Sequence, residues 1–544
     1  MQQVRADEVS ATEWRWVIIF SGLLVLITLL PYAWAFASDA PNDGWQFMGM
    51  LYNHTDGATY LGKINQGLRG NWLFHLDYTP EETNGIAIQV FYLALGHVAR
   101  LFGLSALMIF HIARLLASFV MYISIYHLGS VIWQKQRARR LFFGLVSIGA
   151  GLGWLAIVFS NSFQPSDLYI PESIPFYSSL VNPHFPLAIA LIALTTAAYL
   201  RVFRPGFEER PRVSNGGVTV LLLSIALCIV QPQGWVPVGI ALATYLVVIA
   251  FMDRRLPNLQ ISWAAMFLLP GLPIFVYYLA IANYDPAYQI WNQQNQTPSP
   301  TPLSYLVGFG LLLVVAIPGI LRAVRRFERD GDRYMLIWLI TTSIMLYAPF
   351  NLQRRLSIGL IIPIAFFAVR AMEDYWLNRI SPPLRRVAMI ALMVFIIPSN
   401  VFTMLIPLYG VMNPAKGIEQ AIMLPKNTYT ALQWLKANGR VGSVVLALPK
   451  PTSLWVPAYT DMRVVYGHEY ETLNAADKLK QVQAWYNDGT DCQGLLQQYN
   501  VRYILIEPVE GKPESPGMAC VNALNLGEPA QRFGDTSIYV YEAR

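Results

Sequence analysis

The sequence predicts an all-α polytopic membrane domain of about eleven transmembrane helices, followed by a C-terminal soluble α/β domain. Only 13% of the 544 residues are charged, whereas a soluble domain carries about 25%. Apolar runs repeat over residues 17–410, and each is close to the ~20 residues that cross a ~30 Å hydrocarbon core. Residues 411–544 instead show polar helices and short alternating strands. We therefore expect a membrane domain at 1–410 and a soluble domain at 411–544.

Eleven apolar segments are long enough to be candidate spans. They are 15–36, 104–133, 141–160, 183–202, 216–230, 235–252, 260–283, 303–321, 334–350, 357–374 and 387–409. The segment 86–102 is also apolar, but counting it as a span would place a basic loop on the outer side. We expect it to lie along the outer interface as an amphipathic helix.

The basic residues predict the orientation. The five loops that fall on one side hold 18 Lys and Arg residues, and the short loops on the other side hold two. Cytoplasmic loops carry such an excess, so we expect a cytoplasmic N-terminus and an extracytoplasmic C-terminal domain in the cell membrane. The net charge of +6 therefore reflects orientation next to membrane lipids, and we expect no nucleic-acid partner.

The long first outer loop, residues 38–103, holds the main candidate site. Asp56, Tyr60 and Lys63 recur at helical spacing, so they share one face of a helix. A loop of this length is usually functional. Two interpretations of Asp56 stay open here: a functional carboxylate, or an N-cap that only satisfies backbone N–H groups at the helix start.

Other outer loops add four candidates. Asp167 lies in the loop 161–182, which holds no basic residue, and His184 begins the next span. A histidine at a helix end is more often structural than catalytic. Arg354 and Arg355 are the two basic residues of the outer short loops. They either contact lipid headgroups as a snorkelling pair or bind an anionic group such as phosphate.

The soluble segment alternates helices and strands. We expect a helix over 428–438, strands at 444–447, 503–506 and 537–541, and two helices near 474–500. No Gly-rich nucleotide fingerprint occurs in it. His468-Glu469 is either a site or a turn, and we favour the turn. Cys492 and Cys520 form a disulfide only if this domain faces an oxidising compartment, so their pairing stays open.

Several short motifs follow one another in a recognisable order. Asp56-Gly-Ala-Thr-Tyr60 precedes Gly70-Asn71-Trp72, then Leu101-Phe102-Gly103, then a span that contains Arg114. This order resembles the GT-C superfamily of membrane glycosyltransferases, which includes protein O-mannosyltransferases and aminoarabinose transferases. In that group, the acidic residue that opens the loop is often followed by Glu, and here Gly57 stands there. This departure leaves open whether the loop binds a metal or uses a single carboxylate.

The resemblance implies an inverting glycosyltransferase that moves a sugar from a polyprenyl-phosphate donor to a glycan, lipid or protein acceptor at the outer membrane face. Asp56 is the expected general base, and Asp167, as the second catalytic residue, is expected to position the acceptor or the sugar. The expected substrate-binding residues are Arg354, Arg355, Tyr60, Lys63 and His184. No metal triad with clean spacing occurs in the sequence, so we expect no cofactor and no essential divalent metal.

The alternative is a non-enzymatic membrane protein with a GT-C-like fold, either a transporter or a scaffold and assembly partner. A transporter typically shows charged or broken helices in repeated halves. His111, Arg114 and His127 lie within one span, but no second matching half is visible. A scaffold would keep the helices and have no use for Asp56 or Arg354.

Overall fold

The computed structural model describes residues 9–39, 44–159, 163–328, 331–509 and 514–542. By internal contacts the chain divides into two compact units. Unit 1 comprises Met1–Leu29, Ile112–Tyr278 and Gln296–Leu405, and unit 2 comprises Leu30–His111, Leu279–Asn295 and Ile406–Arg544. The packing therefore groups the first outer loop with the C-terminal segment. The predicted division at residue 410, which separates lipid from water, stays a prediction.

The fold is mostly helical, and the apolar runs form long helices because a spanning backbone must satisfy its own N–H and C=O groups. Among the described residues, nine helices or helix pairs are long and apolar enough to cross a membrane. They are α1 (Ala11–Asp39), α4 (Ala106–Ile132), α5 (Gln136–Ile148) with α6 (Gly153–Phe159), α9 (His184–Val202), α11 (Pro232–Asp253), α12 (Asn258–Tyr284), α14 (Pro302–Arg326), the segment Gln353–Arg379 around α16 (Ile361–Ala371), and α18 (Pro382–Ile396) with α19 (Pro398–Met412).

Two further predicted spans form shorter helices, α10 (Gly217–Val230) and α15 (Asp332–Met345). All eleven predicted segments are therefore helical in the structure, and the polytopic all-α fold class is confirmed. The chain is a multi-pass membrane protein. The side of the membrane on which each terminus lies stays a prediction.

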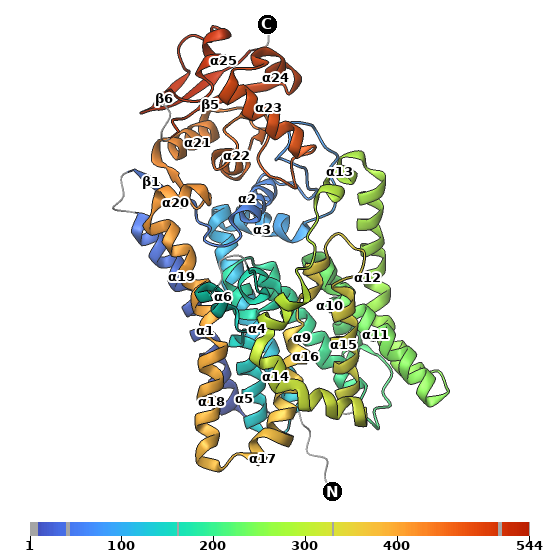
Figure 1. The fold of residues 1–544 in the computed structure, drawn as a ribbon. Helices are drawn as coiled ribbons and strands as arrows, with labels where there is room; N and C mark the ends of the chain where they lie inside the picture. Colours follow the sequence, from blue (N-terminus) through green and yellow to red (C-terminus); the bar gives the residue numbers. More distant parts are fainter. Residues whose placement is uncertain (1–8, 40–43, 160–162, 329–330, 510–513, 543–544) are drawn as a thin grey trace. The chain divides into compact units, whose positions relative to one another are not determined.

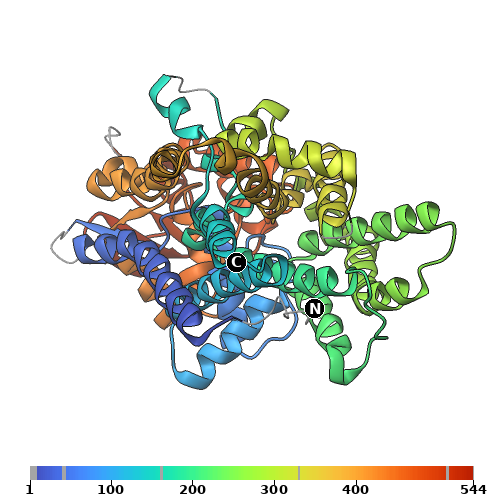
Figure 2. The same cartoon turned by 90° about the horizontal axis from the view of Figure 1, so that it is seen from below.

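Close helix contacts in unit 1 depend on small residues. Helix α14 lies against α16 (Figures 1 and 2), and a Cβ added at Gly319 of α14 would lie 2.3 Å from the carbonyl oxygen of Phe367. Only glycine allows the two backbones to approach this closely. The remaining short elements of this unit are α7 (Ser166–Tyr169), η1 (Pro171–Ser173), α8 (Pro175–Leu180), η2 (Val213–Asn215), η3 (Gln353–Ser357), η4 (Met372–Trp376) and α17 (Leu377–Arg379).

In unit 2, the first outer loop forms two packed helices, α2 (His54–Leu68) and α3 (Val90–Phe102). A Cβ added at Gly96 would lie 2.2 Å from the carbonyl oxygen of Ile64, so this pair also depends on glycine. The predicted helix within 86–102 is thus present as α3. Its exposed face carries Leu101 and Phe102, the apolar side chains expected of an interfacial helix, whereas its place in the membrane stays a prediction.

The C-terminal segment forms a small α/β fold. Its five-stranded sheet has the order β4-β3-β5-β7-β6, with β3 parallel to β4 and β5, and with β7 antiparallel to β5 and β6. The strands are β3 (Val444–Leu446), β4 (Arg463–Val464), β5 (Val501–Ile506), β6 (Gln531–Phe533) and β7 (Thr536–Val540). The other elements of unit 2 are β1 (Trp45–Phe47), β2 (Met423–Pro425), α13 (Pro286–Gln294), α20 (Pro414–Glu419), α21 (Lys426–Asn438), α22 (Thr452–Thr460), α23 (Ala475–Asp488), α24 (Cys492–Gln498) and α25 (Met518–Ala523). The predicted α/β class of this segment is confirmed.

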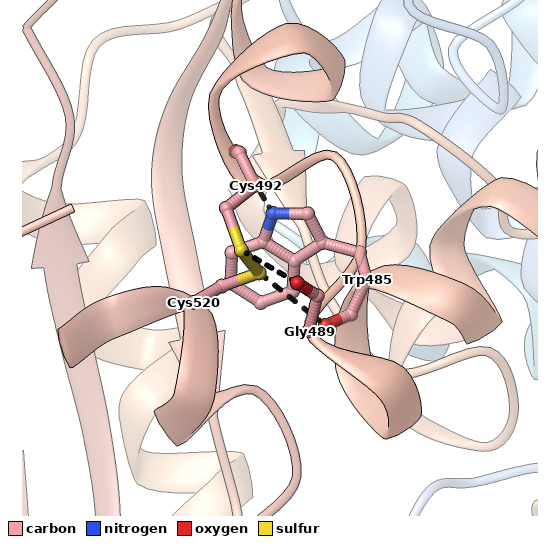
Figure 3. Close-up of a disulfide and its surroundings, with 4 residues drawn as sticks. All are labelled: Trp485, Gly489, Cys492 and Cys520. Atoms are coloured by element: carbon pink, nitrogen blue, oxygen red, sulfur yellow. Dashed lines mark hydrogen bonds between the residues drawn. A yellow bond between two sulfur atoms is a disulfide. The ribbon is translucent and has the colours of Figure 1, made fainter. Parts of the chain in front are cut away.

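One disulfide cross-links this fold. Cys492 at the start of α24 is bonded to Cys520 in α25 (Figure 3). The bond packs beside Trp485, whose indole N–H donates to the carbonyl oxygen of Cys492 at 3.1 Å. The pairing that the sequence left open is therefore present in the structure.

Candidate active site

Helix α2 presents Asp56 from its first turn. The helix begins at His54, and its N-cap is Asn53, which has a left-handed backbone (φ 45°). Asp56 is therefore the third helical residue, and the interpretation of Asp56 as the N-cap is wrong. A carboxylate in the first turn still gains from the positive end of the helix dipole.

Both oxygens of the Asp56 carboxylate have polar neighbours, yet the side chain remains 26% exposed. The side-chain amide of Asn53 donates to Oδ2 at 3.1 Å. Nε2 of His468 lies 3.5 Å from Oδ1. Asp56 is thus a positioned carboxylate that an outside group can reach.

The tautomer of His468 follows from its other ring nitrogen. Nδ1 accepts the backbone N–H groups of Tyr470 at 3.0 Å and of Glu471 at 3.2 Å. An accepting ring nitrogen carries no proton, so the proton of the neutral ring is on Nε2, the atom that faces Asp56. The ring itself is 2% exposed. His468 does stand beside a turn, as we favoured from the sequence, and it also faces the candidate base.

His54 is the nearest other titratable group on α2. Burial and, to a smaller extent, the nearby charge of Lys450 lower the pKa of its imidazole to about 4, against the opposing charge of Asp56. His54 is therefore neutral at physiological pH, and it adds no positive charge beside Asp56.

Tyr60 and Lys63 lie on the same face of α2 as Asp56, as predicted. The Lys63 ammonium contacts Glu471 at 2.5 Å, three residues beyond the His468 that faces Asp56. Lys63 also donates to the Thr59 hydroxyl at 3.0 Å, and its side chain is 2% exposed. Tyr60 stacks on Tyr92 with ring centroids 4.2 Å apart. These are the contacts of packed, buried residues, and the substrate-binding roles predicted for Tyr60 and Lys63 remain untested.

Asp167 in unit 1 is completely buried. Its Oδ2 accepts the backbone N–H groups of Gly151 and Gly153, both at 3.0 Å, in the link between α5 and α6. Burial outweighs these hydrogen bonds and raises the pKa of the carboxyl to about 6. These hydrogen bonds hold the backbone where α5 ends and α6 begins. The catalytic role predicted for Asp167 stays a prediction.

Arg354 and Arg355 are half-buried in η3 of unit 1. The Arg354 guanidinium lies over the Tyr169 ring at 5.1 Å, and the described residues place no carboxylate within ion-pair distance of it. This arrangement leaves the Arg354 charge available to an anion. His184, the first residue of α9, is 3% exposed, and its ring centroid lies 4.2 Å from that of Phe185. The substrate-binding role predicted for His184 stays a prediction.

The predicted site residues fall into both units. Asp56, Tyr60 and Lys63 belong to unit 2, whereas Asp167, His184, Arg354 and Arg355 belong to unit 1. That they line one outward cavity stays a prediction. In the part of the chain that the structure describes, no group of three or more His, Cys, Asp or Glu side chains is suited to hold a metal ion. The expectation of no essential metal is untested.

The sequence alone suggests a site or a turn at His468 without linking it to Asp56, and it does not single out Glu471. They are separated from Asp56 and Lys63 by about 410 residues, and no short motif marks such a contact.

Comparison with solved structures identifies the class of fold, which is that of the GT-C membrane glycosyltransferases. The oligosaccharyltransferase of Archaeoglobus fulgidus is 13% identical, with a TM-score of 0.55 over 90% of this chain and 67% of its own. ArnT from Cupriavidus metallidurans is 11% identical, with a TM-score of 0.55 over 97% of this chain and 98% of its own. No known family and no curated protein matches the sequence. The GT-C fold that the motifs predicted is therefore confirmed.

Proposed function

We propose that the protein is a membrane glycosyltransferase that transfers a sugar from a polyprenyl-phosphate donor to a hydroxyl-bearing glycan, lipid or protein acceptor outside the cytoplasm. The observation that carries this proposal is the Asp56 carboxylate, which accepts a hydrogen bond from Asn53, lies beside His468 and remains partly exposed. The GT-C fold supports the same class of reaction. The disulfide supports an oxidising, extracytoplasmic location of the C-terminal segment.

The proposed reaction is a single displacement with inversion. The acceptor oxygen attacks the anomeric carbon, its proton passes to Asp56, and the bond from that carbon to the phosphate oxygen breaks with both electrons leaving on the phosphate. The products are the glycosylated acceptor, protonated Asp56 and the polyprenyl phosphate. Asp56 then returns its proton to water.

His468 fits the role of a positioning residue in this reaction. Its Nε2–H faces Oδ1 of Asp56 at 3.5 Å, so the ring is placed to orient the carboxylate. Oδ2, which accepts from the Asn53 amide at 3.1 Å, is the proposed acceptor of the proton.

Arg354 and Arg355 are proposed to bind the departing phosphate. The leaving oxygen gains negative charge in the transition state, and a guanidinium can grip a phosphate at two points. The Arg354 charge meets only an aromatic ring among its described contacts, which supports this role.

The decisive experiment measures turnover of a polyprenyl-phosphate sugar by the purified protein in nanodiscs. Asp56→Asn keeps the side-chain size and cannot accept the proton, so we expect a loss of ~10²–10⁴-fold in rate with unchanged folding. Asp477→Asn, which removes an exposed carboxylate on α23, is the matched control. Arg354→Lys keeps the charge and loses the two-point grip, so a smaller loss is expected.

The possible outcomes separate the proposals. Full activity of Asp56→Asn would show that the carboxylate has no role as a base. A wild-type protein that is inactive with several lipid-linked donors would favour the scaffold. Turnover that persists in EDTA would bear out the expectation that metal is not essential, and rescue of EDTA-treated protein by a divalent cation would overturn it.

A further inference from the structure

A polar cavity lies in unit 2, formed by other side chains than those around Asp56. Its volume is about 740 Å³, within the range of small-ligand sites. One wall comes from the segment 69–83 of the first outer loop. The other is built from residues in 440–444, 461–463, 500–502 and 541–542 of the C-terminal segment, and it includes the carboxylates of Asp461 and Glu542. Every lining residue belongs to unit 2.

Two arginines of the cavity have charges that the protein does not neutralise. In the described ranges, neither Arg440 nor Arg502 has a carboxylate at ion-pair distance. The Nε–H of Arg502 is buried and has no described acceptor. No described carboxylate offsets the two guanidinium charges, so they are suited to a bound anion.

The other two arginines of the cavity differ because they are held by the protein. Arg69 contacts Asp461 at 2.5 Å. Arg463 donates to the carbonyl oxygens of Pro80 and Gly442, at 2.8 and 3.0 Å. Arg440 and Arg502 are therefore the pair that remains available to an anionic ligand.

The outer-loop wall offers hydrogen-bond acceptors. Asp77, Glu81 and Glu82 all line the cavity. Glu81 is paired with Lys478 at 2.6 Å, and Glu82 lies 3.4 Å from Arg463. Ionised carboxylates only accept hydrogen bonds. Asp77 already accepts from the Gln66 amide at 2.7 Å, and the side chain of Glu82 is 91% exposed. A ligand suited to both walls carries an anionic group for the arginines and hydroxyl donors for the carboxylates.

We propose that this cavity binds an acidic saccharide, a sugar that bears a carboxylate or a phosphate, with the anionic group on Arg440 and Arg502 and the hydroxyls toward Asp77 and Glu82. A bidentate guanidinium contact suits either anion. The site goes beyond the proposed transfer reaction. One outer-loop segment lies between this cavity and the candidate active site. Asp77 of that segment lines the cavity, and the next residue, Tyr78, packs on His468, with ring centroids 6.0 Å apart.

The test measures binding to the full-length protein in nanodiscs by saturation-transfer NMR and calorimetry. The probes are glucuronic acid and glucose 6-phosphate, and glucose is the neutral control. We expect saturable binding of at least one anionic probe, with glucose weaker by about tenfold or more, because one charged hydrogen bond contributes that much. The preferred probe identifies the anion as carboxylate or phosphate.

Variants tie the binding to the two arginines. Arg440→Gln with Arg502→Gln should weaken binding of the preferred probe by about tenfold or more. Arg532→Gln, which removes an exposed charge from β6 outside the cavity, should leave it unchanged. Arg440 is exposed, so Arg440→Gln alone should also weaken binding and keeps the test valid if the double variant unfolds.

The Asp56→Asn variant should bind the probe like the wild type. Turnover therefore tests the proposed transfer reaction and probe binding tests this cavity, so the failure of one can be told from the failure of the other. Binding of neither anionic probe, equal binding of glucose, or unchanged binding in folded Arg440→Gln and in the folded double variant would overturn the proposal.

Discussion

The buried ion pair between Lys63 and Glu471 joins the first outer loop to the C-terminal segment within unit 2, and its removal should be costly. The two side chains are 2% and 9% exposed, and their charged atoms are 2.5 Å apart. Glu471→Gln leaves the ammonium buried, with the Thr59 hydroxyl at 3.0 Å as a neutral partner. Breaking one side of such a pair costs about 3–5 kcal/mol in the free energy of unfolding.

Two aromatic rings beside Lys63 keep the cost of Glu471→Gln toward the lower end of this range, because they still stabilise the ammonium when Glu471 is replaced. Its ammonium lies 4.9 Å from the Tyr60 ring centroid and 5.2 Å from that of Phe74, and cation–π contacts of this kind retain about 1–2 kcal/mol when desolvated. Unit 2 has roughly 240 residues, and 1 kcal/mol shifts the melting temperature of a unit of that size by about 2–4 °C. We therefore expect Glu471→Gln to lower its melting temperature by roughly 6–20 °C.

The assay follows thermal unfolding of the purified protein in detergent. The exposed pair of Lys416 and Glu419, at 3.2 Å, supplies the matched control, because Glu419→Gln should change the free energy by about 1 kcal/mol or less. Lys63→Met combined with Glu471→Leu should recover most of the loss, since no uncompensated charge remains. Equal effects of Glu471→Gln and Glu419→Gln would refute the reasoning.

Four further predictions concern other groups. Burial raises the pKa of Glu507 from 4.5 to about 7, so the wild type loses stability as the pH rises through this window and the buried carboxyl ionises. In urea unfolding at pH 8, Glu507→Gln should therefore be more stable than the wild type by on the order of 3 kcal/mol. Near pH 4.5 the two proteins should be nearly equal in stability. Asp167→Asn should lower the melting temperature and retain turnover per folded molecule, whereas a large rate loss without destabilisation would restore its catalytic role. Replacing Cys492 and Cys520 by Ser, which opens a loop with a sequence separation of 28, should cost about 3–4 kcal/mol in unfolding of the C-terminal fold, and an unchanged free energy would contradict this. A cysteine at the exposed Ala476 should react with an impermeant thiol reagent in intact cells, and its protection would reverse the predicted topology.

Features that depend on neighbouring residues could be predicted from the sequence. Hydropathy located all eleven helical segments, because spanning length and apolar composition are local properties. The strands β3, β5 and β7 were also predicted, since alternating β-branched residues between turns suffice to indicate them. The shared face of Asp56, Tyr60 and Lys63 follows from helical periodicity alone.

Features that depend on distant residues could not be predicted. Nothing near Lys63 indicates that its charge is neutralised by Glu471, and nothing near Asp56 indicates His468. The helix start was misjudged for a subtler reason. Asn53 takes a left-handed conformation that asparagine tolerates, so the helix begins at His54, before the acidic residue that a capping preference would select. The Cys492–Cys520 bond likewise required knowledge of where α24 and α25 lie.

The pairing of β1 with β2 has a consequence for biosynthesis. Trp45 lies opposite Pro425, so a ribosome that adds about 5–20 residues per second needs roughly 20–80 s between the two strands. During this time the spans between them must insert while β1 has no partner strand and Lys63 has no Glu471. The outer loop can therefore reach its final packing only after translation is nearly complete. A nascent chain halted after its last span would carry an exposed strand edge, which quality-control chaperones and proteases recognise more readily than a missing catalytic group.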